Sequence, residues 1–142
     1  MAVDSKASTV WRGGLATGAG TVSAASGSFD LELTWAHRAE SRASGTSPEE
    51  LIAAAHAGCF AMALSHALGL AGHEPERLTT SSTVTFQPGQ GITAIHLVVA
   101  GAVPGVTADE FGDIAEGAKT GCPVSQALAG VPQITLEATL ES

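Results

Sequence analysis

The sequence contains few charged side chains, and few of those are basic. Charged residues make up 14% of the 142 residues, with six Lys and Arg against fourteen Asp and Glu, so the formal net charge is -8. A chain of this sign is repelled by nucleic acid and by anionic membrane surfaces. Hydrophobic residues make up 44%, which is typical of a globular protein. So little charge indicates much buried surface, which fits an oligomer better than a monomer.

The chain also lacks the marks of export or of several domains. Its amino-terminal residues do not show the charged and then apolar pattern of a signal peptide, so we expect a cytoplasmic protein. The sequence shows no repeat, no low-complexity linker and no internal boundary, which predicts one domain over residues 1–142. One run, residues 51–70, has the length of a membrane span. Its Ala and Gly content, its two His and the two acidic residues at its start favour a core helix instead.

That apolar run predicts the element around which the rest of the chain is organised. Ala and Leu dominate it and Pro is absent, so we expect a helix of about six turns. Ser47 is a good N-cap, Pro48 suits the first helical position, and Glu50 completes a capping box. The clearly polar side chains within the run are His56, Ser65 and His66. A helix that is apolar all round must be buried on all sides, here by sheets and by a second copy of the chain.

Alternating apolar residues and turn residues predict the other elements. Strands are expected at residues 6–12, 21–23, 29–35, 78–86, 92–103 and 133–141, and the fourth and fifth form a hairpin. Two further helices are expected at 108–119 and from 123 to 128, and residues 36–46 form a polar loop. The order βββ-α-ββ-α-α-β defines an α+β fold.

Cysteine is scarce, and the two that occur, Cys59 and Cys122, form no C-x-x-C pair. This excludes the usual zinc-ribbon and thioredoxin patterns. Cys122 precedes Pro123 at a predicted helix start, where backbone N–H groups and the helix dipole favour a thiolate. Cys59 lies mid-helix without such help from the backbone, so a cation would have to be brought to it from elsewhere. By its sequence position alone, Cys59 is interpreted most simply as a small core residue.

The two histidines of the long helix allow several interpretations. His56 lies one turn before Cys59 and is a possible metal ligand or a base for the thiol. His66 lies on nearly the same face as Cys59. Two ligands on one turn do not make a metal site, so His66 and Cys122 would also have to converge. Hydrogen-bonded core or interface histidines are the simpler interpretation of both.

Two separated motifs resemble the OsmC/Ohr family of thiol-dependent peroxidases. The block PEELIAAAHAGCFAMALS surrounds the first cysteine, and GCPVSQAL surrounds the second. The AHAxCF form around the first cysteine is that of the OsmC branch, and the resemblance extends over nearly the whole chain. It implies an OsmC-like α+β fold with a long buried central helix, assembled as an intertwined homodimer.

The resemblance also implies a mechanism. Cys59 matches the cysteine that attacks the hydroperoxide O–O bond and becomes a sulfenic acid, and Cys122 matches the cysteine that resolves it to an intramolecular disulfide. A sulfenic acid without a second thiol risks over-oxidation, and a thiol activated at a helix start is a good attacker. The expected substrates are organic hydroperoxides, with hydrogen peroxide as a further candidate. No metal or other cofactor is implied, and the implied reductant is a dithiol such as dihydrolipoamide.

In this family an arginine, held by a glutamate just inside the long helix, activates the first cysteine. By position the glutamate is Glu49. Arg38 matches the OsmC-type position after the third strand, although the connection to the Pro-Glu motif is about one residue longer than usual. Arg42 in the same loop and Arg12 remain as alternatives.

The spacing of Glu49 and Cys59 bears on the assembly. They are ten residues apart, so about 15 Å of helix separates their Cα atoms. One arginine cannot reach both unless the helix bends sharply. Two antiparallel copies of the helix would bring Glu49 of one chain near Cys59 of the other. We therefore expect a homodimer with two composite active sites.

Two other functions are compatible with the same residues. A non-catalytic dimer could sense oxidants or bind small apolar ligands, with the cysteine pair as a switch. A Cys/His metal-binding protein is a third interpretation. A sensor is oxidised stoichiometrically, whereas an enzyme consumes many equivalents of peroxide, so turnover separates the first two.

Overall fold

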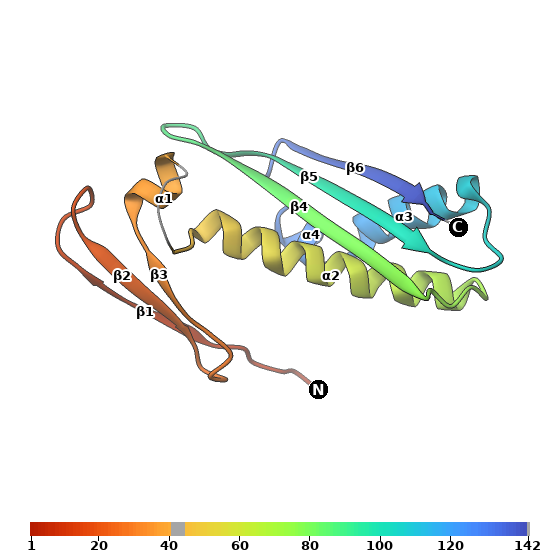
Figure 1. The fold of residues 1–142 in the computed structure, drawn as a ribbon, viewed down its shortest axis with the longest axis horizontal. Helices are drawn as coiled ribbons and strands as arrows, with labels where there is room; N and C mark the ends of the chain where they lie inside the picture. Colours follow the sequence, from red (N-terminus) through yellow and green to blue (C-terminus); the bar gives the residue numbers. More distant parts are fainter. Residues whose placement is uncertain (41–44, 142) are drawn as a thin grey trace. The chain divides into compact units, whose positions relative to one another are not determined.

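Two three-stranded sheets divide the chain into two compact units, Met1–Leu51 and Ile52–Ser142 (Figure 1). The computed structural model describes residues 1–40 and 45–141. Both units combine strands and helices, which confirms the predicted α+β class. That the two units act as one domain stays a prediction.

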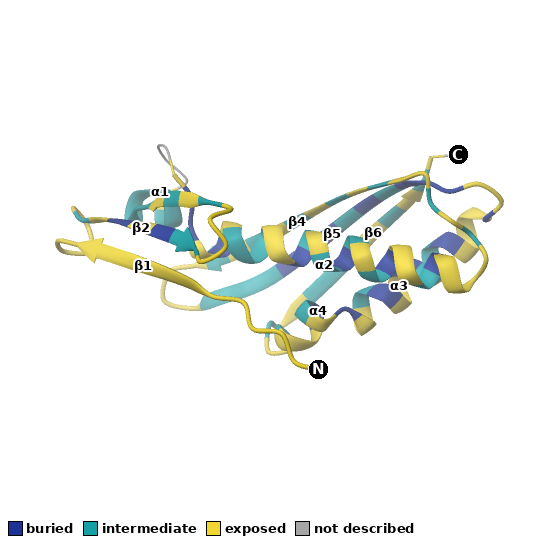
Figure 2. Cartoon of the chain, turned by 90° about the horizontal axis from the view of Figure 1, so that it is seen from below, coloured by how far each residue is buried: buried dark blue, intermediate teal, exposed yellow. Residues whose placement is uncertain are grey.

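The first unit is built on an antiparallel sheet with the order β1-β2-β3. Its strands are β1 (Ala7–Arg12), β2 (Ala19–Ala24) and β3 (Asp30–Leu33). Gly20 on β2 lies opposite Trp11, and a Cβ there would come within 2.8 Å of the indole ring. Glycine therefore leaves room for the ring to lie across the neighbouring strand. Every residue of β1 is exposed (Figure 2).

The predicted polar loop between the third strand and the long helix contains a helix that the pattern did not indicate. Trp35, which we expected in the strand, begins α1 (Trp35–Glu40). The Thr34 hydroxyl accepts a hydrogen bond from His37 N at 3.1 Å, which is the N-cap role that Thr commonly takes. A helix of six residues is too short to show the helical period by which longer helices are predicted. The order is thus βββ-α-α-ββ-α-α-β.

The long helix α2 (Pro48–Leu70) begins where the capping residues predicted. Ser47 Oγ accepts a hydrogen bond from Glu50 N at 3.0 Å, which confirms Ser47 as the N-cap. The second half of the capping box differs from the prediction. Glu50 Oε1 accepts a 2.6 Å hydrogen bond from the Thr46 hydroxyl, so the carboxylate is engaged one residue before the cap.

Ser47→Ala is expected to lower the free energy of unfolding by about 1 kcal/mol, because the Glu50 N–H then loses its hydrogen-bond acceptor. Urea denaturation followed by far-ultraviolet circular dichroism measures the change. Ser81→Ala, at an exposed position in the strand Arg77–Gln87, is the matched control and should change stability by under about 0.5 kcal/mol. Equal effects of the two substitutions would contradict the capping role.

The second unit is built on a mixed sheet with the order β4-β5-β6. The predicted hairpin is present, as β4 (Arg77–Gln87) pairs antiparallel with β5 (Gly91–Ala102). The last strand, β6 (Gln133–Leu140), pairs parallel with β5. A parallel neighbour requires a crossover connection. Helices α3 (Ala108–Gly121) and α4 (Pro123–Ala127) provide it.

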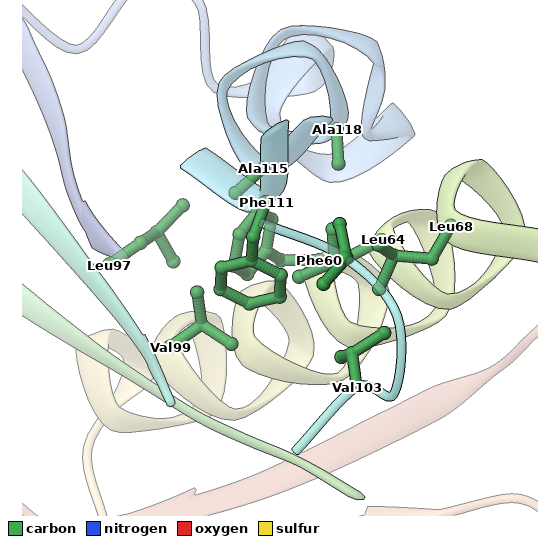
Figure 3. Packing of buried hydrophobic residues seen from close by; sticks show 10 residues of the cluster. Phe60, Leu64, Leu68, Leu97, Val99, Val103, Phe111, Ala115 and Ala118 are labelled. Carbon is green, nitrogen blue, oxygen red and sulfur yellow. The ribbon is translucent and has the colours of Figure 1, made fainter. Parts of the chain in front are cut away.

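The core of this unit lies where α2, α3 and the sheet meet (Figure 3). Phe60, Leu64 and Leu68 recur every four residues along one side of α2 and are fully buried. They share the cluster with Leu97, Val99, Val103, Phe111, Ala115 and Ala118. A Cβ on Gly101 would come within 2.6 Å of the Phe111 ring. The aromatic ring therefore packs directly on the β5 backbone.

Within one chain, helix α2 is buried along one side and exposed along the other. Its outer side is exposed, with Met62 at 71% and Leu70 at 78% (Figure 2). The helix is long and apolar enough to span a bilayer, but its opposite side lies in the core just described, as in a soluble fold. Covering of the outer side by a second copy of the chain stays a prediction.

Candidate functional site

The fold brings the two cysteines together although they are far apart in sequence. Cys59 lies in the middle of α2, and Cys122 ends α3 and begins α4. Their sulfur atoms are 3.0 Å apart, and both are free thiols within hydrogen-bonding distance. Either sulfur can donate in this pair. Two thiols so placed can form a disulfide with little movement of the backbone.

The two sulfurs differ in access to solvent. Cys122 is fully buried, whereas Cys59 is partly exposed. A molecule that approaches from solvent therefore meets Cys59 first. Cys122 has no surface exposed to such a molecule.

The surroundings of Cys122 favour a thiolate. Burial acts to raise the pKa of this thiol, but hydrogen bonds from Cys59, from the backbone and side chain of Ser125 and from the Val124 backbone outweigh burial and lower the pKa. Most of these donors lie at the start of α4, where amides without helical partners are expected.

The surroundings of Cys59 favour a neutral thiol. Burial raises its pKa, and the hydrogen bond and charge of Cys122 raise it further. The Val124 backbone N–H acts in the opposite direction, so the expectation that Cys59 receives no backbone help was wrong in part. Because the two thiols share one hydrogen bond, they lose their protons in two coupled steps. Activation of Cys59 then needs a further positive charge.

His56 is a fully buried neighbour of this site. Its Nε2 atom is 2.7 Å from the Ser125 hydroxyl. Burial lowers the pKa of His56, so the imidazole is neutral near pH 7. The described residues contain no group of three or more His, Cys, Asp or Glu side chains that could hold a metal ion, and His66 is exposed.

In the first unit, Arg38 and Glu49 form a two-pronged ion pair. Arg38 Nε is 3.0 Å from Glu49 Oε1, and a terminal guanidinium nitrogen is 3.0 Å from Oε2. Glu49 is only 6% exposed, and the guanidinium lies 5.9 Å from the centroid of the Trp35 ring. Such a pair holds the guanidinium plane in one orientation. Of the alternative arginines, Arg12 ends exposed β1 and Arg42 lies outside the described residues.

A small apolar pocket of about 170 Å³ adjoins this ion pair. Arg38 is its charged member, and the other lining residues are Trp11, Leu15, Leu33, Thr34, Trp35 and Pro48. A positive group at the edge of an apolar pocket suits a molecule with one polar end and a hydrocarbon body.

Comparisons with known proteins agree with the two motifs. The sequence model of the OsmC-like protein family matches residues 41–137. Over their full lengths, the chain is 42% identical to the peroxiredoxin OsmC of Escherichia coli, aligned over 145 residues. Among solved structures, the organic hydroperoxide resistance protein OhrB of Bacillus subtilis matches with a TM-score of 0.67 at 25% identity, covering 96% of this chain and 98% of that one. An OsmC-like protein from Mycoplasma pneumoniae shares the fold, with a TM-score of 0.75 at 19% identity and 99% coverage of both chains. The chain belongs to the OsmC-like protein family.

Two participants in the site were not found from the sequence. Val124 acts to lower the pKa of both thiols, and Ser125 acts to lower that of Cys122. The Pro at the first helical position of CPVS indicated a helix start. It could not indicate that α4 directs its first amides at a cysteine of another helix.

Proposed function

We propose that this protein is a cysteine-based peroxidase that reduces organic hydroperoxides. The observation that carries the proposal is the pair of free sulfurs 3.0 Å apart, one partly exposed and one fully buried. A solvent-accessible thiol backed by a second thiol is the arrangement that peroxide reduction by two cysteines needs. The names of the Escherichia coli and Bacillus subtilis relatives, a peroxiredoxin and an organic hydroperoxide resistance protein, support this class of reaction.

The reaction divides into three balanced steps. The Cys59 thiolate attacks the distal peroxide oxygen, the O–O bond breaks, and the departing alkoxide takes up a proton to become an alcohol. The Cys122 thiolate then attacks the Cys59 sulfenic sulfur, so that a disulfide forms and hydroxide leaves as water after gaining a proton. A dithiol reductant attacks the disulfide, becomes a cyclic or linear disulfide itself and returns both cysteines to thiols.

Arg38 and Glu49 are proposed to supply the charge that Cys59 needs. The thiol has a raised pKa, and a guanidinium beside the sulfur would favour its thiolate and the developing alkoxide. Glu49 and Cys59 lie on the uninterrupted helix α2, about 15 Å apart along its axis. We therefore place Arg38 of the partner subunit against Cys59 in a homodimer with two composite sites. The exposed apolar side of α2 offers a surface for such a partner.

The pocket beside Arg38 supports a preference among peroxides. Its two tryptophans and two leucines would bury a hydrocarbon tail, whereas hydrogen peroxide has none. We propose alkyl hydroperoxides as the preferred substrates, a dithiol such as dihydrolipoamide as the reductant, and the cytoplasm as the location.

The test is peroxide consumption by the purified protein with a dithiol, comparing cumene hydroperoxide with hydrogen peroxide. Many equivalents consumed per protein, with a kcat/KM at least about tenfold higher for cumene hydroperoxide, is the expected result, since burial of an apolar group of this size contributes well over 1.4 kcal/mol. Consumption of a single equivalent with every dithiol would instead indicate an oxidant sensor. Equal rates for the two peroxides would contradict the preference for alkyl hydroperoxides that we infer from the pocket beside Arg38.

A further inference from the structure

We propose that His56 and Ser125 are positioning residues that aim the Ser125 hydroxyl hydrogen at the sulfur of Cys122. The inference rests on the proposed two-cysteine reaction and adds to it the control of the second step. It assigns a role to a buried histidine and a serine that the reaction steps above do not use.

The first observation is a continuous line of contacts behind the reactive sulfur. The His56 imidazole is 2.7 Å from the Ser125 hydroxyl, the Ser125 side chain acts to lower the pKa of the Cys122 thiol, and the Cys122 sulfur is 3.0 Å from that of Cys59. His56 and Cys122 are fully buried and Ser125 is 8% exposed. Water therefore competes little for any of these hydrogen bonds.

The second observation is that one nitrogen of His56 has no partner. Among the described residues, no hydrogen-bonding group lies within reach of its buried Nδ1 atom. A buried N–H without an acceptor is rarer in native proteins than a buried acceptor without a donor. The neutral ring is thus better accommodated with its proton on Nε2 and a bare lone pair on Nδ1.

The tautomer of His56 determines which atom donates in each hydrogen bond from the imidazole through Ser125 to Cys122. With its proton on Nε2, the imidazole donates to the Ser125 oxygen, so the Ser125 proton is free to point at Cys122. The opposite tautomer would draw the Ser125 proton toward the ring and leave only an oxygen lone pair facing the sulfur. Burial keeps the ring neutral by lowering its pKa, so His56 acts by orientation and not by charge.

Local geometry explains why these residues meet. His56 precedes Cys59 by one turn of α2, so the two side chains leave neighbouring faces of that helix. Ser125 lies in the first turn of α4, and the backbone of Val124 and Ser125 also acts to lower the pKa of Cys122. An unsatisfied buried nitrogen costs about 1–3 kcal/mol. An apolar residue of similar size would avoid that cost, so packing alone does not account for the histidine.

The chemical consequence falls on the two steps in which Cys122 carries negative charge. A hydroxyl that donates to the sulfur stabilises the thiolate that attacks the Cys59 sulfenic acid. It also stabilises the same thiolate when the dithiol attacks the exposed Cys59 sulfur and Cys122 leaves, since a more stable leaving thiolate departs faster. The attack of Cys59 on the peroxide does not place new charge on Cys122.

The direct test measures the acidity of Cys122 when it is the only thiol. In a Cys59→Ser background, the pH titration of thiolate ultraviolet absorbance reports Cys122 alone. Ser125→Ala should raise the midpoint by about one pH unit, the worth of one hydrogen bond to a charged group. His56→Phe should raise it in the same direction, and Ser125→Thr, which keeps a hydroxyl, should restore it.

The other titratable groups around this sulfur do not confound the measurement. On α2 the nearby groups are His56, the substituted Cys59 and His66, which lines a pocket together with Gly121 and Pro123. On α3, Lys119 lies one turn before Cys122 and is paired with Glu116 at 3.0 Å. All these groups are the same in the serine variants and their parent. Ser81→Ala, exposed on β4, is the matched control and should leave the midpoint unchanged.

A second measurement connects the acidity to the reaction in the protein that keeps both cysteines. After one equivalent of cumene hydroperoxide, rapid mixing at a pH below the pKa of Cys122 should show that Ser125→Ala slows disulfide formation about threefold. A pKa raised by about one unit lowers the thiolate fraction about tenfold, and the higher nucleophilicity of that thiolate offsets about threefold of the loss. Formation of the sulfenic acid, trapped with dimedone, should slow much less. His56→Gln, whose side-chain amide can still donate to Ser125, should fall between wild type and Ser125→Ala.

These outcomes separate the inference from the proposed function. An unchanged titration midpoint in both Ser125→Ala and His56→Phe would overturn the inference even if the wild-type protein turns over peroxide. A wild-type protein that consumes no peroxide would remove the proposed function, while the titration would still decide whether the hydroxyl is aimed at Cys122. If His56→Phe does not fold, the titration midpoint of Cys122 in His56→Gln and in the serine variants tests the same inference.

Discussion

Cys59→Ser should abolish turnover of peroxide, whereas Cys122→Ser should consume one equivalent and then stop. The serine hydroxyl at position 59 is not ionised near neutral pH and cannot take oxygen from a peroxide. Without Cys122, the Cys59 sulfenic acid forms but no second sulfur stands 3.0 Å away to resolve it. Peroxide consumption under excess dithiol, with mass spectrometry of the protein, measures both outcomes.

The Cys122→Ser protein should accumulate a mass gain of one oxygen, followed by further oxidation when peroxide is in excess. A sulfenic acid that the dithiol reduces directly would give slow residual turnover, and this should remain a small fraction of the wild-type rate. Full activity of either variant would contradict the assignment of peroxide attack to the partly exposed Cys59 and of disulfide formation to the buried Cys122. Activity that is lost equally in both, with no oxidised intermediate, would contradict the order of the steps.

Mixed dimers of Arg38→Ala and Cys59→Ser should regain activity that neither variant shows alone. Arg38→Ala removes the guanidinium that Glu49 holds at 3.0 Å, and we expect its kcat/KM to fall about a hundredfold, as for the loss of one charge-stabilising donor. If each site combines Arg38 of one chain with Cys59 of the other, a mixed dimer contains one complete site. Random exchange of subunits in a two-fold dimer then predicts about a quarter of the wild-type activity.

The experiment needs subunits that have been mixed, either by expressing both variants together or by refolding them together. Arg77→Ala is the matched control, because Arg77 forms a similar ion pair with Glu141 at 3.1 Å but is much more exposed. It should leave kcat/KM within about twofold, since exposed pairs contribute little. Mixtures no more active than the average of their components would show that each site lies within one chain.

Much of the fold could be predicted because its signals are local. The six strands and helices α2, α3 and α4 were predicted from alternation, apolar runs and turn residues. Their observed bounds differ from the predicted ones by a few residues. The start of α2 followed from Ser47 and Pro48. Helix α1 was missed because six residues are too few to show a helical period, and Glu50 was misassigned because the Thr46 hydroxyl is a competing partner.

The candidate site could be predicted only in part. The motif around each cysteine indicated thiol-dependent peroxidase chemistry, and the position after the third strand indicated Arg38 as the activating arginine. The pairing of Arg38 with Glu49 depends on α1, which orients the arginine side chain toward the beginning of α2. The raised pKa of Cys59 and the lowered pKa of Cys122 depend on burial and on amides of α4. Such effects arise from atoms that are distant in sequence.

By itself, the sequence determined which segments become helices and strands, where α2 begins, and that Cys122 stands at a helix start, because each depends on neighbours within a few residues. Only the tertiary structure decided that Cys59 and Cys122 meet, that one is exposed and the other buried, and that His56 faces Ser125. These outcomes depend on how α2, α3 and α4 pack against one sheet. Packing sums many weak contacts between remote residues, and no single stretch of sequence contains that sum.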